Sequence, residues 1–262
     1  MMLVSNVRMW TTIQAFLSLN IALANAQANA SWPYQTFKTE PTFQPPQLQI
    51  TRNGTPAPGY LFFAPGGAAH QAAPLIMTDE GQLVYHGANY NSGFSFGTQT
   101  YNDEQVLVYW NGTKYSEPAG RGNGFVVILD RTYTPIANVT LPGNFVTTEG
   151  PTFSTNIDLH ELYITNRNTL LVTGNNATQA DLTSVGGPKD GWVVDGQVYE
   201  IDIKTNEILF SWSALNHTAE IPFTASTYPL GSEGFNGQNR TLAWGYFRKS
   251  FSVCRRSTTD ND

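Results

Sequence analysis

Short apolar runs separated by tight polar turns are the feature that most limits what this chain can fold into. Two such runs joined by a turn recur four times, at residues 74–86, 125–141, 161–173 and 198–212. Each unit places Asp, Asn, Gly or a Lys-Thr-Asn sequence where the chain must reverse, as β-hairpin turns require. Further strands are expected at residues 60–64, 94–98 and 105–110. Almost no stretch carries helical i, i+3, i+4 spacing, so the sequence predicts a nearly all-β fold.

The recurrence of these units at tens of residues favours a β-propeller. Aromatic residues close several strands, as at Tyr109-Trp110 and Trp212. A propeller blade takes four strands in about 40 to 50 residues, so residues 59–247 would supply about four blades. A β-sandwich is the alternative, because it also shows short strands about every 8 to 12 residues.

The first 26 residues have the pattern of a secretory signal peptide. Arg8 precedes an apolar run at residues 13–23, and Ala24-Asn25-Ala26 offers small residues for cleavage. The apolar run is shorter than the roughly 20 residues that span a bilayer. We therefore expect a secreted, extracellular chain without a membrane segment after signal cleavage. Residues 27–58, rich in Pro, Thr and Gln, are expected to form an extended lead-in.

Composition argues against several kinds of partner. The chain carries 20 acidic against 14 basic side chains, whereas a nucleic-acid-binding protein needs a basic surface. Cys254 is the only cysteine, so no intrachain disulfide forms and the fold depends on burying a core. Four aspartates lack the spacing of a calcium loop and are expected in turns and caps, so no metal or cofactor is predicted. They are Asp181, Asp190, Asp195 and Asp202.

Asn-x-Ser/Thr sequons agree with a secretory route. They begin at Asn29, Asn53, Asn111, Asn138, Asn176, Asn216 and Asn239. An occupied sequon must face solvent, so these positions are expected on loops or outer strands.

A set of short motifs in the second half of the chain resembles a known family. The motifs are Asp158-Leu159-His160-Glu161, Thr173-Gly174, Asp181-Leu182, Gly186-Gly187-Pro188, Gly191-Trp192, Asp195, Glu200-Ile201-Asp202 and LFSWSAL at residues 209–215. The earlier segment PLIMTDEGQLVYHG, residues 74–87, is similar to the first blade of the same proteins. On these residues the chain resembles the fungal secreted branch of the arylsulfotransferase-like (ASST) family over about residues 59–247.

This resemblance implies a six-bladed β-propeller that moves a sulfuryl group from a phenolic sulfate ester to another phenol, without a nucleotide sulfate donor. In characterised bacterial relatives a histidine in the central channel becomes transiently sulfated, and other histidines and an arginine assist. Such chemistry needs a nitrogen nucleophile, cationic groups for the sulfonate oxygens and an acid for the leaving phenolate. The implied partners are small phenols and their sulfate esters, and no cofactor is implied.

His160 is the candidate that the resemblance supports best. It matches the family's Asp-x-His-Glu at the start of a blade, where side chains point toward the channel. The implied role is sulfate binding or proton transfer, not covalent catalysis. The alternative is a structural histidine held by Asp158 or Glu161. A zinc protease motif is excluded, because His160-Glu161 lacks a second histidine four residues on.

The other histidines are expected to have structural roles. His217 resembles a family corner that reads Ala-Leu-Asp-His, but Asn216 opens a sequon there, which favours a structural loop. His70 and His86 lie around the first hairpin, and nothing in their spacing indicates a ligand.

The C-terminal part departs from the family. Residues 242–248 resemble a segment that normally ends in histidine, so Arg248 takes the place of an expected second site residue. Residues 248–262 then form a divergent basic tail without a strand pattern. Because the later blades do not follow, we expect a truncated gene product with an incomplete site. The alternatives to an enzyme are a non-catalytic secreted β-propeller glycoprotein and an inactive fragment of a longer gene.

Overall fold

The structure is a computed structural model that divides into two units, residues 1–51 and residues 52–262. It describes residues 33–65, 73–87, 93–114, 121–147, 152–226, 228–232, 237–240 and 243–244. In the described part of the first unit, residues 33–51, an isolated bridge joins Tyr34 to Pro46. The backbone N–H of Gln35 donates to the carbonyl of Pro45 at 2.9 Å, so the bridge closes a loop.

The second unit is built from strands, as the sequence predicts. The strands are β1 Tyr60–Phe63, β2 Leu75–Thr78, β3 Leu83–His86, β4 Gly93–Tyr101, β5 Glu104–Lys114, β6 Gly122–Leu129, β7 Pro135–Val139, β8 Pro142–Val146, β9 Thr152–Thr155, β10 Ile157–Ile164, β11 Thr169–Ala180, β12 Gly191–Asp202 and β13 Ile208–Ser213. Short 3-10 turns follow late strands: η1 Thr183–Val185, η2 Ala214–His217 and η3 Phe223–Ala225. The all-β prediction is confirmed.

The four hairpins expected from the sequence are all present, as β2–β3, β6–β7, β10–β11 and β12–β13. Three of the four turns place Gly or Asn in the left-handed backbone region, whereas the β6–β7 turn places Tyr133 there, with φ 64°. Gly81 has φ 81°, Asn168 has φ 60° and Asn206 has φ 61°. Gly and Asn adopt these angles more readily than other residues. For this reason the Gly and Asn residues in the sequence marked the positions of these three hairpin turns correctly.

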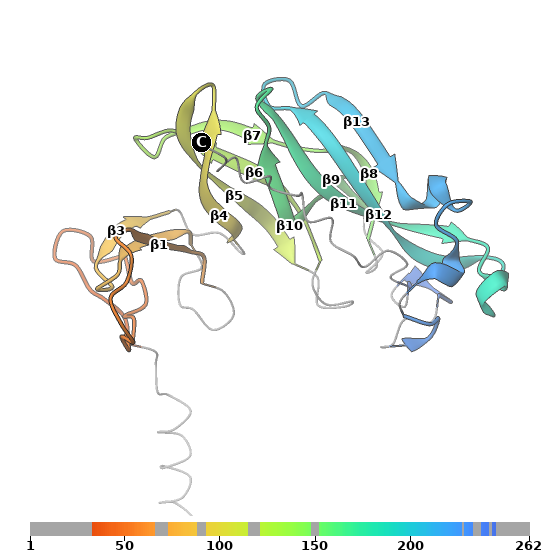
Figure 1. Cartoon of the computed structure of the whole chain (residues 1–262), viewed down its shortest axis with the longest axis horizontal. Coiled ribbons are helices and arrows are strands. Elements are labelled where there is room, and N and C mark those ends of the chain that lie inside the picture. The colour runs from red at the N-terminus through yellow and green to blue at the C-terminus, as the bar shows by residue number, and fades with distance from the viewer. Residues whose placement is uncertain are drawn as a thin grey trace, which may run out of the picture. The chain divides into compact units, whose positions relative to one another are not determined.

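Two antiparallel groups of four consecutive strands make up the main sheet (Figure 1). The first group is β4 to β7 and the second is β10 to β13, and within each group every strand pairs with the next. A single residue pair, Gly124 of β6 with Ile157 of β10, joins the groups into one sheet. A separate three-stranded sheet has the order β1-β2-β3. Among the described strands the main sheet is open, ending at β13 and β4, so the β-propeller remains a prediction.

The largest buried cluster lies between the two groups of strands. Val108 and Trp110 of β5 meet Leu162 of β10 and Leu170 of β11 in it. A second cluster joins Ile76 of β2 to the opposite face of the first group. Both faces of the β4–β7 group are therefore covered by apolar side chains, which fixes its strands firmly.

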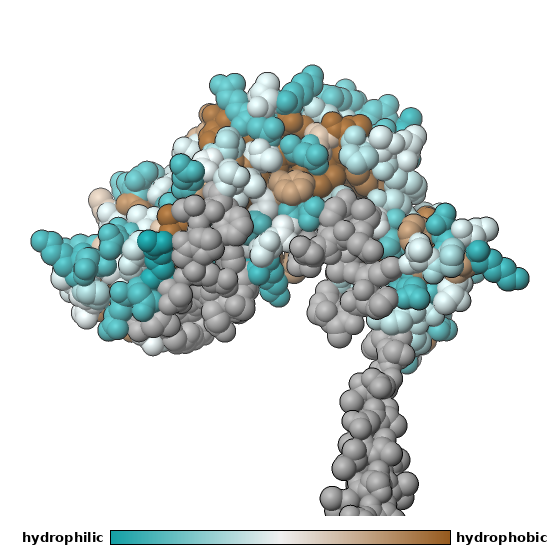
Figure 2. Space-filling model, turned by 180° about the vertical axis from the view of Figure 1, so that it is seen from behind, coloured by the Kyte–Doolittle hydropathy of each residue, from teal (hydrophilic) through white to brown (hydrophobic). Residues whose placement is uncertain are grey.

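Apolar side chains remain exposed elsewhere on the strands. Figure 2 shows brown apolar side chains at the surface among teal polar ones. Leu209 and Phe210 of β13, the edge strand of the second group, are 50% and 51% exposed. Leu209 is the extra residue at an irregularity in the β12–β13 register, where Glu200 pairs with Phe210 but Ile201 pairs with Ile208.

Candidate functional site

Strand β10 presents Asp158 and His160 on one face of the sheet. Side chains alternate along a strand, so these two residues point away from Ile157 and Leu159, which are buried in the large core cluster. The Asp158 side chain is 5% exposed, whereas the His160 side chain is 47% exposed. The carboxylate is thus fixed in the protein while the imidazole is open to solvent.

A short hydrogen bond joins the two side chains. His160 Nδ1 lies 2.6 Å from Asp158 Oδ2. An ionised carboxylate only accepts, so Nδ1 carries the proton and donates it. The neutral ring then presents Nε2 as a lone pair, able to take up or release a proton. The sequence left open whether Asp158 or Glu161 would contact His160, and the contact is with Asp158.

The pKa of His160 is raised above its ordinary value of 6.5. The hydrogen bond to Asp158 is the largest cause, because it stabilises the imidazolium. Burial and the positive charge of Arg121 act in the opposite direction, and the carboxylate of Glu161 adds a small further increase. The net rise makes His160 a better proton acceptor near neutral pH.

The Asp158 carboxylate has a second fixed partner. Asn175 of β11 donates from its side-chain Nδ2 to Asp158 Oδ1 at 2.8 Å. The side-chain amide of Asn156 in turn donates to the backbone carbonyl of Asn175. Asp158 therefore has one oxygen held by Asn175 and the other by His160.

Arg121 lies beside the same pair. It directly precedes β6 and is 8% exposed. Gly124 of β6, three residues after Arg121, pairs with Ile157 of β10, three residues before His160. The effect of Arg121 on the pKa of His160 agrees with this placement.

The backbone around the pair departs from regular pairing. The register of β10 with β11 shifts between Ile157 and Leu162, so the residues from Asp158 to Glu161 are outside the regular ladder. Ser95 of β4 compensates, because its hydroxyl donates to the carbonyls of Leu159 and His160 at 2.9 and 3.0 Å. Such irregularities are common beside active sites, where they direct a side chain.

Some buried polar atoms at this place have no protein partner. Asn123 is 4% exposed, and neither polar atom of its side-chain amide is bonded within the described part of the chain. The same holds for Oδ1 of Asn156. A buried amide without a hydrogen-bond partner reduces stability.

The sequence model of the arylsulfotransferase (ASST) family matches residues 97–250, more than half of the chain. The chain belongs to this family. Neither a search of curated proteins nor a search of solved structures gave a match. The matched segment contains Arg121, Asp158, His160 and Asn175, so the whole cluster lies in the ASST part of the chain.

The other histidines were expected to have structural roles, and Arg248 was the second candidate site residue. Within the ASST segment, His217 stacks on Trp212 at 5.0 Å, and its Nδ1 lies 2.8 Å from the carbonyl of Ser213. These contacts agree with a structural role. His86 ends β3, and its Nδ1 lies 2.7 Å from the carbonyl of Gly87. Arg248 and His70 lie outside the described residues.

Of the four aspartates that were expected in turns and caps, Asp190 lies in an exposed turn and the other three accept hydrogen bonds. Asp181 accepts from the backbone and hydroxyl of Thr183, and Asp202 accepts similarly from Thr205. Asp195 lies within β12 and not in a turn, but it has a cap-like role. It accepts from the Ser213 hydroxyl at 2.7 Å and from the backbone N–H of Leu215, at the start of η2, at 3.1 Å. Within the described residues no group of three or more His, Cys, Asp or Glu side chains is arranged to hold a metal ion.

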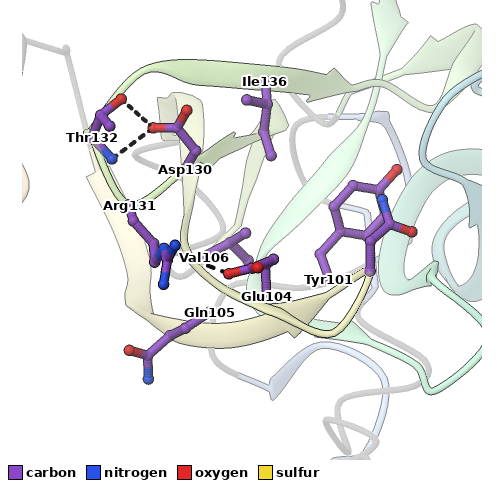
Figure 3. Close-up of a pocket in the computed structure, with 9 residues that line it drawn as sticks. Tyr101, Glu104, Gln105, Val106, Asp130, Arg131, Thr132 and Ile136 are labelled. Atoms are coloured by element: carbon purple, nitrogen blue, oxygen red, sulfur yellow. Dashed lines mark hydrogen bonds and ion pairs between the residues drawn. The ribbon is translucent and has the colours of Figure 1, made fainter.

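A pocket of about 360 Å³ lies at the other end of β6, between the β4–β5 and β6–β7 turns. Figure 3 shows Asp130 bonded to Thr132, and Arg131 directed toward Glu104. The hydroxyl of Thr132 lowers the pKa of Asp130. The Arg131–Glu104 pair spans 3.5 Å between highly exposed side chains. These charged groups bond to turn residues or to one another. The pocket is therefore a weaker candidate for a functional site than the Asp158–His160 cluster.

Sequence reasoning identified His160 but missed Arg121, Asn123 and Asn175. Arg121 is the only charged residue between Glu117 and Asp130, and it stands among glycines in the sequence Gly120-Arg121-Gly122. This isolated charge in a glycine-rich segment is the one sequence signal that could have identified Arg121. Asn175 carries no comparable signal, because its role depends on the β10–β11 register.

Proposed function

We propose that this protein is a secreted arylsulfotransferase that moves a sulfuryl group from a phenolic sulfate ester to a phenol acceptor. The observation that carries the proposal is the Asp158–His160 pair, with its 2.6 Å hydrogen bond, inside the segment that matches the ASST family. The half-exposed imidazole is accessible to a small ligand, and Arg121 supplies a permanent positive charge beside it.

In this proposal His160 transfers a proton and does not carry the sulfuryl group. Its Nε2 takes the proton of the acceptor hydroxyl as the acceptor oxygen forms a bond to sulfur. The bond from sulfur to the donor phenol oxygen breaks, and the leaving phenolate takes the proton back from the imidazolium. Arg121 and the imidazolium offset the negative charge of the sulfonate oxygens during the transfer. One phenol and one sulfate ester are consumed, and one of each is formed.

We also propose that the strands are blades of a β-propeller. Two consecutive groups of four antiparallel strands share the largest buried cluster, and a three-stranded sheet packs on the first group through Ile76. Radially packed four-stranded meanders are the construction of a propeller. The first strands of the two groups are neighbours, because side chains of β4 bond to the backbone of β10. This is the arrangement of the inner strands of adjacent blades.

The purified full chain is expected to transfer sulfate between aryl compounds. Incubation with a chromogenic aryl sulfate and a phenol acceptor should release the coloured phenol and form the acceptor sulfate in equal amounts, as measured by absorbance and mass spectrometry. The His217→Gln variant should retain the activity, because His217 stacks on Trp212 and bonds to the carbonyl of Ser213 in a structural role. The absence of any acceptor sulfate with the wild-type chain would leave a non-catalytic binding protein as the better interpretation.

Secretion would be accompanied by selective glycosylation. Asn53, Asn138, Asn216 and Asn239 are exposed, whereas Asn111 and Asn176 are partly buried within strands. The side chain of Asn176 is also engaged in the fold, because its Oδ1 accepts a hydrogen bond from the backbone N–H of Val146 at 2.8 Å. Asn29 lies outside the described residues.

After expression through a eukaryotic secretory route, we expect glycans at the four exposed sites and none at Asn176. Enzymatic release in heavy-oxygen water followed by peptide mass spectrometry measures the occupancy of each site. Asn216→Gln should remove one glycan without altering the others, which serves as the control. A cytoplasmic, unglycosylated product from the native host would contradict the proposal of secretion.

A further inference from the structure

We propose that Asn175 is a positioning residue of the site, whose side-chain amide holds the Asp158 carboxylate against His160 and thereby fixes which ring nitrogen carries the proton. The inference deepens the proposed function and depends on it only for its activity measurement. It is carried by the 2.8 Å bond from Asn175 Nδ2 to Asp158 Oδ1.

The carboxylate needs an external support because its own strand does not hold it. Asp158 lies where the β10–β11 ladder is interrupted, and the bonds from Ser95 reach β10 only from the carbonyl of Leu159 onward. Within β10, the backbone N–H of His160 lies 3.3 Å from Asp158 Oδ2, a long contact on the same oxygen that meets the imidazole. Oδ1 is oriented by Asn175 alone among the contacts seen for this carboxylate.

Asn175 is itself well placed to act as a support. It lies in β11, whose pairing with β12 is unbroken over twelve residues and puts Asn175 opposite Gly196. Its carbonyl, on the side where the β10 ladder is interrupted, accepts from the side-chain amide of Asn156. The donor to Asp158 therefore belongs to one of the most regular strands of the sheet.

Two bonds to opposite oxygens define the plane of the carboxylate. With Oδ1 fixed by Asn175, Oδ2 is directed at Nδ1 of His160, and the Nδ1–H tautomer is favoured over the Nε2–H tautomer. Without Asn175, the carboxylate gains freedom to rotate and the tautomer preference weakens. Outer partners of this kind commonly set the tautomer and orientation of a functional histidine.

The experiment uses the full chain labelled with ¹⁵N in histidine. Only four histidines are present, and the His160→Gln spectrum assigns the signal of interest. The wild-type protein should show the Nδ1–H tautomer at His160. Asn175→Ala should give a mixture of both tautomers and lower sulfuryl transfer about tenfold, an effect in the usual range for coupled neighbours.

Asn176→Ala is the matched control. Asn176 is the adjacent asparagine, points to the other face of β11 and makes its own hydrogen bond, to the backbone of Val146. Its replacement removes one hydrogen bond of similar length and should leave the His160 tautomer unchanged. Asn175→Asp keeps the size of the side chain but brings a second carboxylate to Asp158, which should raise the pKa of His160 further.

A double-mutant cycle shows whether Asn175 acts through Asp158. In the Asp158→Asn background, Asn175→Ala should have no additional effect on the tautomer or on transfer. Equal tautomer spectra for Asn175→Ala and Asn176→Ala would overturn the inference, whether or not the protein transfers sulfate. Absence of sulfuryl transfer in the wild type combined with the expected tautomer change would instead count against the proposed function alone.

Discussion

The Asp158→Asn variant is expected to lower sulfuryl transfer by about 100- to 10,000-fold, the usual contribution of a positioned acid or base. The substitution preserves the shape of the side chain but replaces an acceptor by an amide. The 2.6 Å bond to His160 Nδ1 then loses its ionic character, and the amide NH₂ has the wrong polarity for the Nδ1–H tautomer. The ring is no longer held with Nε2 free to take a proton.

The same variant should reverse the pKa shift of His160. Asp158 supplies the largest increase, and the remaining influences of burial and Arg121 lower the pKa, opposed only by Glu161. We therefore expect the pKa of His160 in Asp158→Asn to fall to its ordinary value of 6.5 or below. Histidine NMR titration measures this directly. Glu161→Gln is the control, because Glu161 is the smallest of the causes and should change both quantities little.

The free energy of unfolding should change with pH as His160 titrates. Because the folded-state pKa of His160 is above the unfolded value, protonation of His160 stabilises the folded chain. This contribution is fully present below about pH 6.5 and is lost as the pH rises through the higher folded-state pKa. The difference in free energy of unfolding between wild type and Asp158→Asn, measured with urea, should therefore narrow on going from acid to alkaline pH. A constant difference across this range would contradict the assigned pair.

Local patterns were sufficient to predict the four hairpins and most of the strands, but not β8 or β9. Asn168 and Asn206 stand at turns where a left-handed backbone is needed, and their position in the sequence locates the reversals. The apolar runs beside them form the buried strands. These signals act over a few residues, so a single sequence contains them in full.

The site itself depends on pairings that local patterns do not encode. The bond from Asn175 to Asp158 follows from the interrupted β10–β11 register, and the approach of Arg121 follows from one pair between β6 and β10. Asp195 shows the same limit, because its bonds to Ser213 and Leu215 join residues about twenty positions apart in the sequence. Only His160 was identified in advance, through the family motif rather than through physical patterning.

The Gly124→Ala variant is expected to destabilise the protein by about 3 kcal/mol, at the upper end of the usual cost of overpacking. A Cβ at this position would lie 2.5 Å from Trp110 Cε2 and would also collide with the backbone carbonyl of Asn111. Trp110 is fully buried, and its indole N–H donates to the carbonyl of Ile157 at 2.7 Å. Neither obstacle can move without separating β5 from β6 or pulling the indole away from β10.

Glycines recur around this indole because three strands approach it closely. A Cβ at Gly112 or Gly122 would also meet the Trp110 ring, at 2.6 and 2.9 Å. Gly124 has the greatest consequence of the three, since it also forms the one residue pair between β6 and β10. Displacing it shifts Arg121 relative to His160, so sulfuryl transfer should fall in Gly124→Ala even at temperatures where the variant remains folded.

Gly97→Ala provides the matched control for this prediction. Gly97 also lies within a strand, β4, but a Cβ there would meet no atom within 4 Å. We expect its thermal midpoint to stay near that of the wild type, whereas Gly124→Ala should melt roughly 6 to 12 °C lower. Differential scanning calorimetry of the two variants measures the contrast. Equal midpoints would mean that β5 and β6 can separate enough to admit a methyl group. In that case the close packing on Trp110 would not align β6, which follows Arg121, with β10, which carries His160.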